Sequence, residues 1–237
     1  ARESAATHTG AMAGDYKLMR ARVGRAGVIF AETLQELADI AELLVRCPPL
    51  ARPEIAVLGE SGAFKALTLD LAEELELPLA ALTNENAPAL RAALPPLVPV
   101  SNPLDITAQG LSQPNIYTEA IGSLLDDERV GAVVAGIIQS DPITADIKVP
   151  AILRALDGRT MTKPMIFAGL DEGADMPAHY VTALRERGVP WFPTTERVFA
   201  ALARIGTATR GSAPITVEPL ALPALAGEAG VIPEYRA

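Results

Sequence analysis

Short apolar runs alternate with segments of helical periodicity along most of the chain. An uninterrupted apolar run is typical of a strand buried on both faces, and apolar residues three or four positions apart are typical of an amphipathic helix. The runs predict strands at residues 27–31, 54–59, 77–82, 130–139, 163–170 and 189–192. The periodic segments predict helices at about residues 15–26, 33–47, 64–75, 87–94, 114–126, 147–157, 177–187 and 195–205. Because no hairpin signal separates the strands, right-handed crossovers and an α/β fold with a doubly wound parallel sheet are expected.

For two of these helices, the sequence also predicts what particular side chains do. Thr33 and Glu36 are spaced as a capping box, in which the Thr33 hydroxyl accepts the Glu36 amide proton and the Glu36 carboxylate reaches back to the Thr33 amide. The helix that follows the turn "GESGA" (59–63) is expected to bury one apolar face. That face comprises Phe64, Leu67, Leu71 and Leu75.

Composition constrains the core and the partners. Apolar residues make up 49% of the chain but aromatic residues only 4%, so the core must consist mainly of Ala, Leu, Val and Ile. That balance suits helices packed on a parallel sheet. The formal charge of −9 arises from acids scattered over helical segments, which favours solubility. No cluster of Lys and Arg forms the basic stripe that a phosphate backbone requires, so nucleic acid is not expected as a partner.

Cysteine content and hydropathy bear on location. Cys47 is the single cysteine, which excludes an intramolecular disulfide and a cysteine zinc cluster and fits a reducing compartment. The longest apolar stretches have about eight residues, whereas a membrane-spanning helix needs roughly twenty. The first residues, "ARESAATHTG", have neither a signal-peptide pattern nor an initiator methionine. We therefore expect a cytoplasmic segment of a longer protein, with no membrane contact.

The turn "GESGA" is the first candidate for a binding site. Ligands of open α/β sheets bind outside the carboxyl ends of the strands, and this turn follows the strand predicted at 54–59. Ser61 offers a hydroxyl, and Gly62 and Ala63 present amides at a helix N-terminus, which is an anion-binding arrangement. Ser61 as a plain helix N-cap is the competing interpretation. A serine nucleophile elbow would need G-x-S-x-G, and Ala63 stands where its second glycine is required.

His8, within "THTGAMAG" (7–14), is the second candidate. Neutral imidazole has an unprotonated nitrogen at pH 7 and can attack a phosphoryl group without a separate base. The glycine and alanine residues around it would let the loop approach backbone amides closely. The alternative for His8 is a surface position without a role, and for His179 a solvent-facing or packing position is expected. Acids that follow strands, at 143–148 and 169–175, are expected to cap helices, so no metal site is predicted.

Five motifs occur in an order that resembles the NDP-forming acyl-CoA synthetases, the succinyl-CoA synthetase-like enzymes that include ADP-forming acetyl-CoA synthetases. The motifs are "ATHTGAMAG" (6–14), "AGVIFAETLQELADIAELL" (26–44), "LGESGAFKALTLDLAEELELPLAAL" (58–82), "SNPLDIT" (101–107) and "GVPWFPTTERVFAALARI" (188–205). The resemblance covers about residues 4–206 and implies flavodoxin-like, succinyl-CoA synthetase-like domains. The final "VIPEYRA" (231–237) resembles the lead-in to an ATP-grasp domain in that family.

The resemblance implies part of an acid–thiol ligase that forms acyl-CoA from a small carboxylic acid, CoA and ATP with Mg²⁺, releasing ADP and phosphate. The reaction in such enzymes passes through acyl phosphate and a phosphohistidine, a role that transfers to His8. Phosphate binding is carried over to Thr9, Gly10, Ser61, Gly62 and Ala63. The segment by itself is expected to hold no cofactor and to be inactive, because the CoA-binding and ATP-grasp domains lie outside it in the family layout.

One position departs from the family pattern. Members usually carry Asn-Ser-Gly-Gly where this chain has Glu60 followed by Ser61, Gly62 and Ala63. An acid beside a phosphate site is unfavourable unless Glu60 points away or Lys65 offsets its charge. The substitution motivates an alternative function, a non-catalytic CoA- or acyl-binding regulatory module of the same fold.

The resemblance also predicts a domain organisation. Residues 1–48 would be the C-terminal part of a succinyl-CoA synthetase-like flavodoxin domain that carries the phosphohistidine loop. Residues 49–206 would be a second flavodoxin-like CoA-ligase domain, and 207–237 a linker towards an ATP-grasp domain. The proline-rich stretch at 48–54 marks the first boundary. The expected partners are the CoA-binding and ATP-grasp domains, either fused or as separate subunits, and a homo-oligomer is left open.

Overall fold

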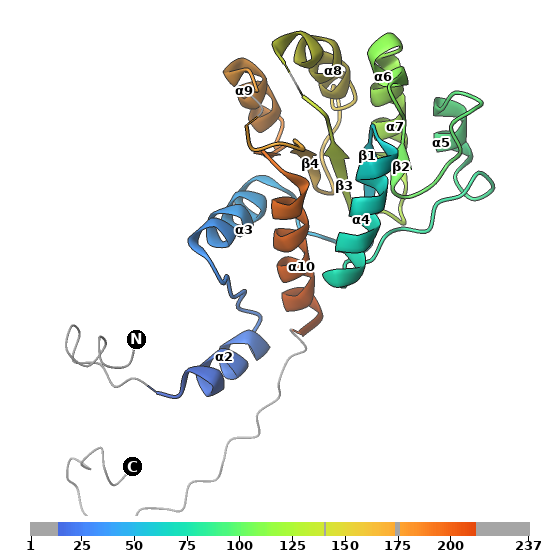
Figure 1. Ribbon diagram of the computed structural model, residues 1–237. Coiled ribbons are helices and arrows are strands. Elements are labelled where there is room, and N and C mark those ends of the chain that lie inside the picture. The colour runs from blue at the N-terminus through green and yellow to red at the C-terminus, as the bar shows by residue number, and fades with distance from the viewer. Residues whose placement is uncertain (1–13, 140, 174–175, 212–237) are drawn as a thin grey trace, which may run out of the picture.

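A five-stranded sheet forms the centre of the part of the chain that the computed structural model describes, residues 14–139, 141–173 and 176–211. The strands are β1 (Ile55–Gly59), β2 (Leu104–Asp105), β3 (Ala132–Gly136), β4 (Met165–Ala168) and β5 (Trp191–Phe192). All neighbouring strands are parallel, and their order is β2-β1-β3-β4-β5 (Figure 1). This is the flavodoxin-like order, so the predicted fold class is confirmed.

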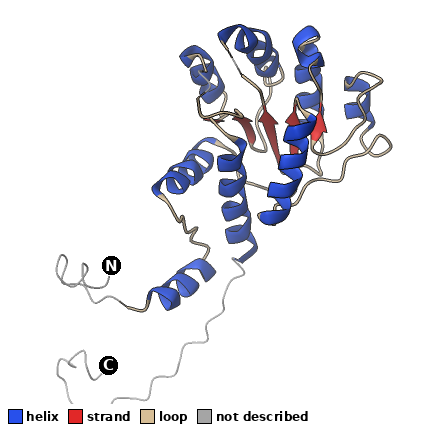
Figure 2. Cartoon of the chain, in the orientation of Figure 1, coloured by secondary structure: helices blue, strands red, loops and turns tan. Residues whose placement is uncertain are grey.

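Helices cover both faces of the sheet (Figure 2). On one side lie α3 (Leu34–Arg46), α4 (Gly62–Glu74) and α10 (Thr195–Gly211), and on the other lie α5 (Pro88–Ala93), α7 (Asn115–Asp126), α8 (Pro142–Arg154) and α9 (Ala178–Glu186). The short α6 (Gln109–Ser112) precedes α7, and α2 (Tyr16–Arg25), which buries no residue, precedes α3. The connections from β2 to β3, β3 to β4 and β4 to β5 each place their helices on one face, whereas the connection from β1 to β2 places α4 on one face and α5 on the other.

Successive residues of the central strands face opposite helical layers. On β1, Ile55 and Val57 pack in the cluster that includes α3, α4 and α10, whereas Ala56 and Leu58 pack against α5, α7 and α8. Strands β3 and β4 alternate in the same way, and every residue of the three strands is buried. Burial on both faces explains why these strands are continuous apolar runs in the sequence.

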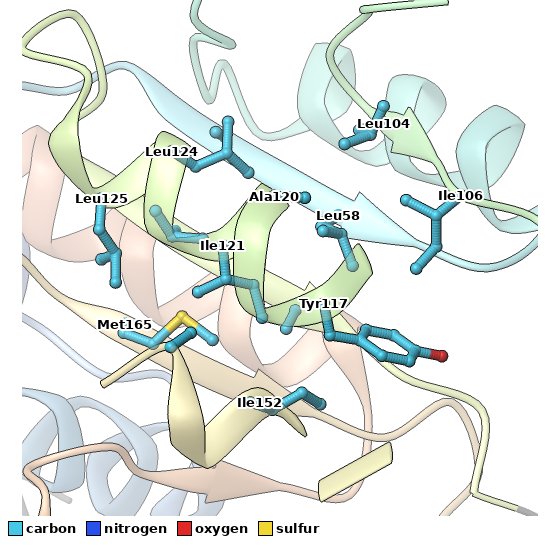
Figure 3. Close-up of a cluster of buried hydrophobic side chains, with 14 of the residues drawn as sticks. Leu58, Leu104, Ile106, Tyr117, Ala120, Ile121, Leu124, Leu125, Ile152 and Met165 are labelled. Carbon is cyan, nitrogen blue, oxygen red and sulfur yellow. The ribbon is translucent and has the colours of Figure 1, made fainter. Parts of the chain in front are cut away.

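Helix α7 supplies much of the cluster on the second face. Its most deeply buried side chains are Tyr117, Ala120, Ile121 and Leu124. Figure 3 shows these side chains together with Leu58, Leu104 and Met165 from three strands of the sheet. The cluster is largely aliphatic, as the low aromatic content predicted.

Helix α3 packs in the same hydrophobic cluster as the sheet, although it precedes the predicted boundary at residue 48. The Thr33 hydroxyl accepts a hydrogen bond from the Glu36 amide at 3.0 Å, as predicted, but the Glu36 carboxylate accepts from the Glu32 amide instead of the Thr33 amide. On the facing side, Arg197 of α10 donates to the buried Asp39 carboxylate, with Nη2 to Oδ1 at 2.6 Å. This ion pair fixes α3 against α10.

The edge of the sheet beside β1 differs from the prediction. The segment predicted as a strand at 77–82 makes an isolated bridge, from Leu79 to Ile55, and the edge strand is β2, in a stretch where no strand was predicted. The side chain of Asn102 connects β1 with the segment at 77–82. Its Oδ1 accepts from the Val57 amide of β1 at 2.9 Å, and its Nδ2 donates to the carbonyls of Ile55 and Ala80 at 2.8 and 3.0 Å. A side-chain amide thus replaces part of a continuous strand, which hydrophobic periodicity does not record.

Two further predictions are wrong. Residues 27–31 form a loop, because no strand in the described ranges lies beside them to pair with their backbone groups. On α4, Leu67 is 56% exposed, whereas Phe64 is buried and Leu71 and Leu75 pack, partly buried, against the same cluster. Thr68 and Ala72, which were not predicted, are buried as well.

In the described ranges, no helix is long and apolar enough to span a membrane.

Candidate functional site

The turn between β1 and α4 lies at the carboxyl edge of the sheet, where open α/β folds bind ligands. Ser61 is the N-cap residue of α4, with extended backbone angles, yet its hydroxyl makes no capping hydrogen bond. The N-cap position of the competing interpretation is therefore confirmed, but without a capping hydrogen bond from the side chain. The amides of Gly62 and Ala63 open the first turn of a helix of 13 residues, whose dipole favours an anion at this end.

The Phe64 ring anchors the start of α4 on the sheet. It packs against Gly59 at the end of β1 and Gly136 at the end of β3, and a Cβ at either glycine would collide with the ring. By contrast, the nearest atom to a Cβ at Gly62 would be Oδ2 of Asp105, at 3.7 Å. The two strand-end glycines therefore let the aromatic ring hold the turn close to the sheet.

Glu60 is buried and faces the helices of the opposite layer. Its Oε1 accepts a hydrogen bond from the Tyr117 hydroxyl of α7, and its Oε2 accepts from the Ile138 amide at 2.8 Å and from Lys148 Nζ of α8 at 2.9 Å. Lys148 is also buried, and its ammonium donates to the Ile138 carbonyl. One carboxylate therefore links β1, the segment after β3, and helices α7 and α8.

The charges around Glu60 explain how an acid is accommodated beside the start of α4. Burial raises the pKa of the Glu60 carboxyl, and the Lys148 ammonium and the Ile138 amide partly oppose that rise. Lys65, one of the two alternatives for relieving the charge at position 60, donates instead from Nζ to Ser101 Oγ at 2.9 Å. Glu60 thus points away from the start of α4, and its neutralising partner is a lysine from a distant helix.

A cavity of about 220 Å³ adjoins the same turn. It lies at the carboxyl ends of β1, β3 and β4 and at the start of α10. Its wall consists of Ser61, Ala63, Phe64, Leu67, Thr68, Leu71, Ile138, Leu170, Thr195 and Glu196. Glu60 does not belong to the wall, so the cavity offers a mostly apolar surface next to a helix N-terminus.

Two buried polar side chains at this edge lack hydrogen-bond partners within the described ranges. Thr68, in the wall of the cavity, is fully buried, and its Oγ1 has no partner. Gln139, just after β3, is 4% exposed, and neither its Oε1 nor its Nε2 has a partner. A Cβ at Gly169 would lie 2.8 Å from Gln139 Nε2, so the amide is held against the end of β4. Unpaired buried polar groups are rare in folded proteins and call for an explanation.

The other residues singled out in the sequence lie as follows. His8, Thr9 and Gly10 fall outside the described residues. His179 is exposed on α9, with its ring 4.1 Å from that of Tyr180, which confirms a surface position. In the described ranges no hydrogen bond joins a histidine to Ser61, so a serine-hydrolase pair gains no support.

Helix capping by the acids of 143–148 and 169–175 is not found in the described ranges: Asp146 lies inside α8 and accepts a hydrogen bond from the Tyr180 hydroxyl at 2.8 Å, and the N-cap of α9 is Pro177. The N-cap of α8 is Asp141, which precedes the predicted stretch, and its carboxylate accepts from the Thr144 amide at 2.9 Å. Helix α8 therefore begins earlier than predicted. The Asp171 carboxylate accepts from the Gly173 amide at 2.8 Å. Over residues 14–139, 141–173 and 176–211, no group of three or more His, Cys, Asp or Glu side chains is placed to hold a metal ion.

Tyr117, Lys148 and Thr68 were not identified as candidates from the sequence. Lys148 lies on the buried face of α8 with Ala145, Val149 and Ile152. A charged residue at an apolar position of a helical pattern was therefore the signal by which a buried lysine could have been predicted. Nothing in the local pattern connected it to Glu60, which is 88 positions away.

The parallel strands and their order define a flavodoxin-like fold. Residues 1–44 match a family model described as the succinyl-CoA ligase like flavodoxin domain. The chain superposes on a dinucleotide-forming acetyl-coenzyme A synthetase of Ca. Korarchaeum cryptofilum, in complex with phosphate and ADP, with a TM-score of 0.69 and 23% identity. That superposition covers 89% of this chain and 44% of the other, and it supports the fold.

Curated relatives point to particular proteins. The chain is 56% identical over 238 residues to a trans-feruloyl-CoA synthase from an unknown prokaryotic organism, which covers 100% of this chain and 34% of that protein. It is 28% identical over 205 residues to the alpha subunit of ADP-forming acetate–CoA ligase II of Pyrococcus furiosus, covering 84% of this chain and 43% of the subunit. The chain thus spans less than half the length of these relatives. The resemblance to the NDP-forming acyl-CoA synthetases is confirmed over the segment that the chain represents.

Proposed function

We propose that this chain is the central segment of an ADP-forming acyl-CoA ligase. The observation that carries the proposal is the 56% identity, along the whole chain, to a protein named trans-feruloyl-CoA synthase. The full enzyme would join a carboxylic acid to CoA at the expense of ATP and release ADP and phosphate. The name of that relative favours an aromatic propenoic acid, ferulic acid, as the substrate.

Three transfers account for the reaction. A nitrogen of the His8 imidazole attacks the γ-phosphorus of ATP, so that an N–P bond forms and ADP leaves. A carboxylate oxygen of the acid then attacks that phosphorus, which yields acyl phosphate and frees the imidazole. Finally the CoA thiolate attacks the acyl carbon, so that the thioester forms and inorganic phosphate leaves, while the thiol proton passes to solvent. Mg²⁺ would accompany ATP, and no step is assigned to it within this chain.

Within this scheme the turn at β1 would bind the phosphoryl group. Thr9 and Gly10 would hold it from the histidine loop, and Ser61, Gly62 and Ala63 would contact its oxygens through a hydroxyl and amides. The positive end of the α4 dipole would stabilise its charge. Because Lys148 neutralises Glu60 on the far side of the turn, an acid at this position is compatible with an anion nearby. The acid at position 60, which motivated the non-catalytic alternative, therefore no longer favours it.

The domain boundaries within this segment are part of the proposal. Residues 1–48 would end one flavodoxin-like domain and carry the phosphohistidine loop, 49–206 would form the second, and 207–237 would link to an ATP-grasp domain. That domain and a CoA-binding domain, fused or as separate subunits, would be the partners.

Phosphorylation of His8 tests the proposal. The full-length protein is incubated with Mg²⁺ and γ-labelled ATP, and acid-labile phosphate is mapped by peptide mass spectrometry. Label on His8 is expected, together with formation of feruloyl-CoA when ferulic acid and CoA are added. His8→Ala should remove both, while His179→Ala, a change at an exposed histidine, should alter neither. Label that survives in His8→Ala, or its absence from the unmodified protein, would refute the phosphohistidine mechanism.

A further inference from the structure

Two loops form the walls of the crevice at the carboxyl edge of the sheet. The chain leaves β1 for β2 on one side and β3 for β4 on the other, so the strand order changes direction between β1 and β3. Open α/β sheets bind their ligands at this point. The turn from Glu60 to Ala63 forms one wall, and the segment after β3, with Ile138, forms the other. The bonds between these two loops therefore fix the shape of the crevice.

One buried ion pair binds both backbone groups of Ile138. The Ile138 amide donates to Glu60 Oε2 at 2.8 Å, and Lys148 Nζ donates both to the same Oε2, at 2.9 Å, and to the Ile138 carbonyl. These three bonds close a ring, and the Tyr117 hydroxyl donates to the remaining carboxylate oxygen. Hydrogen bonds to charged groups are stronger than those between neutral groups. The ring therefore holds the loop after β3 against the turn after β1.

Lys148 is also the counterion of this wall. In the described ranges the titratable groups that face Glu60 are Tyr117 of α7, Lys148 of α8 and Asp105 of β2. Lys148 is the cation among them, and Asp105 adds negative charge on the side of β2. Without the ammonium, ionised Glu60 would be an uncompensated carboxylate next to the turn and would repel an anion there.

We propose that Lys148 is a positioning residue for the transfer of the phosphoryl group from His8 to the acid. In this step a carboxylate oxygen of the acid forms the O–P bond while the N–P bond to His8 breaks. Lys148 contacts neither group. It acts through Glu60, because it cancels the charge beside the phosphoryl group and holds Ile138 opposite the turn. The assignment rests on the proposed function, which places the phosphoryl group at this turn.

Separate measurement of the two half-reactions distinguishes this role from a loss of stability. The full-length enzyme is labelled on His8 with Mg²⁺ and γ-labelled ATP, freed of nucleotide, and mixed with ferulic acid and CoA to follow the discharge of the label. Labelling depends on the ATP-grasp domain, whereas discharge depends on the turn at β1. Lys148→Met should leave the rate constant of labelling within about twofold and slow discharge at least about tenfold at pH 8.

Leu124→Ala is the control for stability. Leu124 is buried in the apolar cluster on the same face of the sheet, so its truncation destabilises the fold without changing a charge. It should change the rate constants of labelling and discharge by the same factor. If Lys148→Met also changes both by one common factor, its role is structural and the assignment is overturned, while the phosphohistidine mechanism stands.

The pH profile and Glu60 variants test the charge. Burial raises the pKa of Glu60, and the loss of Lys148 removes the ammonium that opposes this rise. In Lys148→Met, discharge should therefore slow as pH rises through the Glu60 pKa, because the neutral carboxyl becomes an unpaired carboxylate. The unmodified enzyme should not show this loss. Glu60→Gln in the Lys148→Met background should restore discharge to within about threefold and abolish the pH dependence, because glutamine keeps the shape without the charge.

Glu60→Gln alone makes the test independent of whether Lys148→Met folds. It leaves a cation beside the turn, so discharge should be no slower than in the unmodified enzyme. A pair with only a structural role predicts slower discharge from either single change. Slow discharge in Glu60→Gln, or no recovery in the double variant, would overturn the assignment. Absence of His8 labelling in the unmodified enzyme would instead refute the proposed function, and the assignment with it.

Discussion

Lys148 Nζ lies 2.9 Å from Glu60 Oε2, and both side chains are buried although 88 positions separate them. The pair joins the turn after β1 to α8 and neutralises an acid next to the proposed phosphate site. Because two buried charges cost solvation, the arrangement depends on the further bonds that Tyr117 and Ile138 donate to Glu60.

Removal of either member of this pair should destabilise the sheet. Lys148→Met leaves the Glu60 carboxylate buried without a cation, and a loss of about 3–5 kcal/mol in the free energy of opening is expected. Hydrogen exchange of the β1 and β3 amides in the full-length protein measures that free energy. The double variant with Glu60→Gln should recover much of the loss, because no buried charge remains.

As a control, Arg187→Gln removes the exposed pair with Asp157 and should cost at most about 1 kcal/mol. A loss no larger in Lys148→Met than in this control would contradict the role of the buried pair.

The packing of Phe64 makes the strand-end glycines sensitive to size. Gly59→Ala places a methyl group against the ring and should destabilise the fold by about 1–3 kcal/mol. Phe64→Leu in the same protein should restore part of this loss because it frees space. Gly62→Ala, whose Cβ would have its nearest neighbour at 3.7 Å, should be neutral or stabilising. Thermal unfolding of the three variants checks the order, and equal melting temperatures for Gly59→Ala and Gly62→Ala would contradict the packing argument.

Asn102 should be essential for the edge of the sheet. Asn102→Ala leaves the amide of Val57 and the carbonyls of Ile55 and Ala80 without their side-chain partner, at about 1–3 kcal/mol for each group that stays unsatisfied. Faster hydrogen exchange at the Val57 amide is the expected signature. Asn86→Ala, a change at an exposed asparagine that also bonds to backbone, is the control and should leave Val57 unaffected. Unchanged exchange at Val57 in Asn102→Ala would show that the backbone closes the gap without this side chain.

Cys47 should be unreactive in the folded protein. Burial raises the pKa of its thiol to about 12, so almost no thiolate is present at pH 8. Labelling by iodoacetamide, followed on the Cys47 peptide, should be slow at pH 8 and should reach an ordinary rate in urea. Val45→Cys in a Cys47→Ala background, at a position 83% exposed near the end of α3, should label rapidly without urea. Equal labelling rates for the two positions in the folded protein would contradict the burial of the thiol.

Local sequence signals predicted much of the fold. Helices α3, α5, α7, α9 and α10 begin within one residue of the expected positions, because capping residues and apolar periodicity act within a few residues. The continuous apolar runs at β1, β3 and β4 predicted a sheet covered on both faces, since such strands are stable only between two helical layers. The turn from Glu60 to Ala63 was identified for the same reason, as a strand followed directly by a helix start.

The sequence by itself therefore determined the order and type of the main elements, because their causes are local. Tertiary structure decided which residues meet: Lys148 with Glu60, Asn102 with Val57, and Thr68 with the cavity beside Ser61. It also exposed Leu67 and left residues 27–31 outside the sheet. Those outcomes depend on the shape of neighbouring layers and on hydrogen bonds across 45 to 88 positions, which no local pattern encodes.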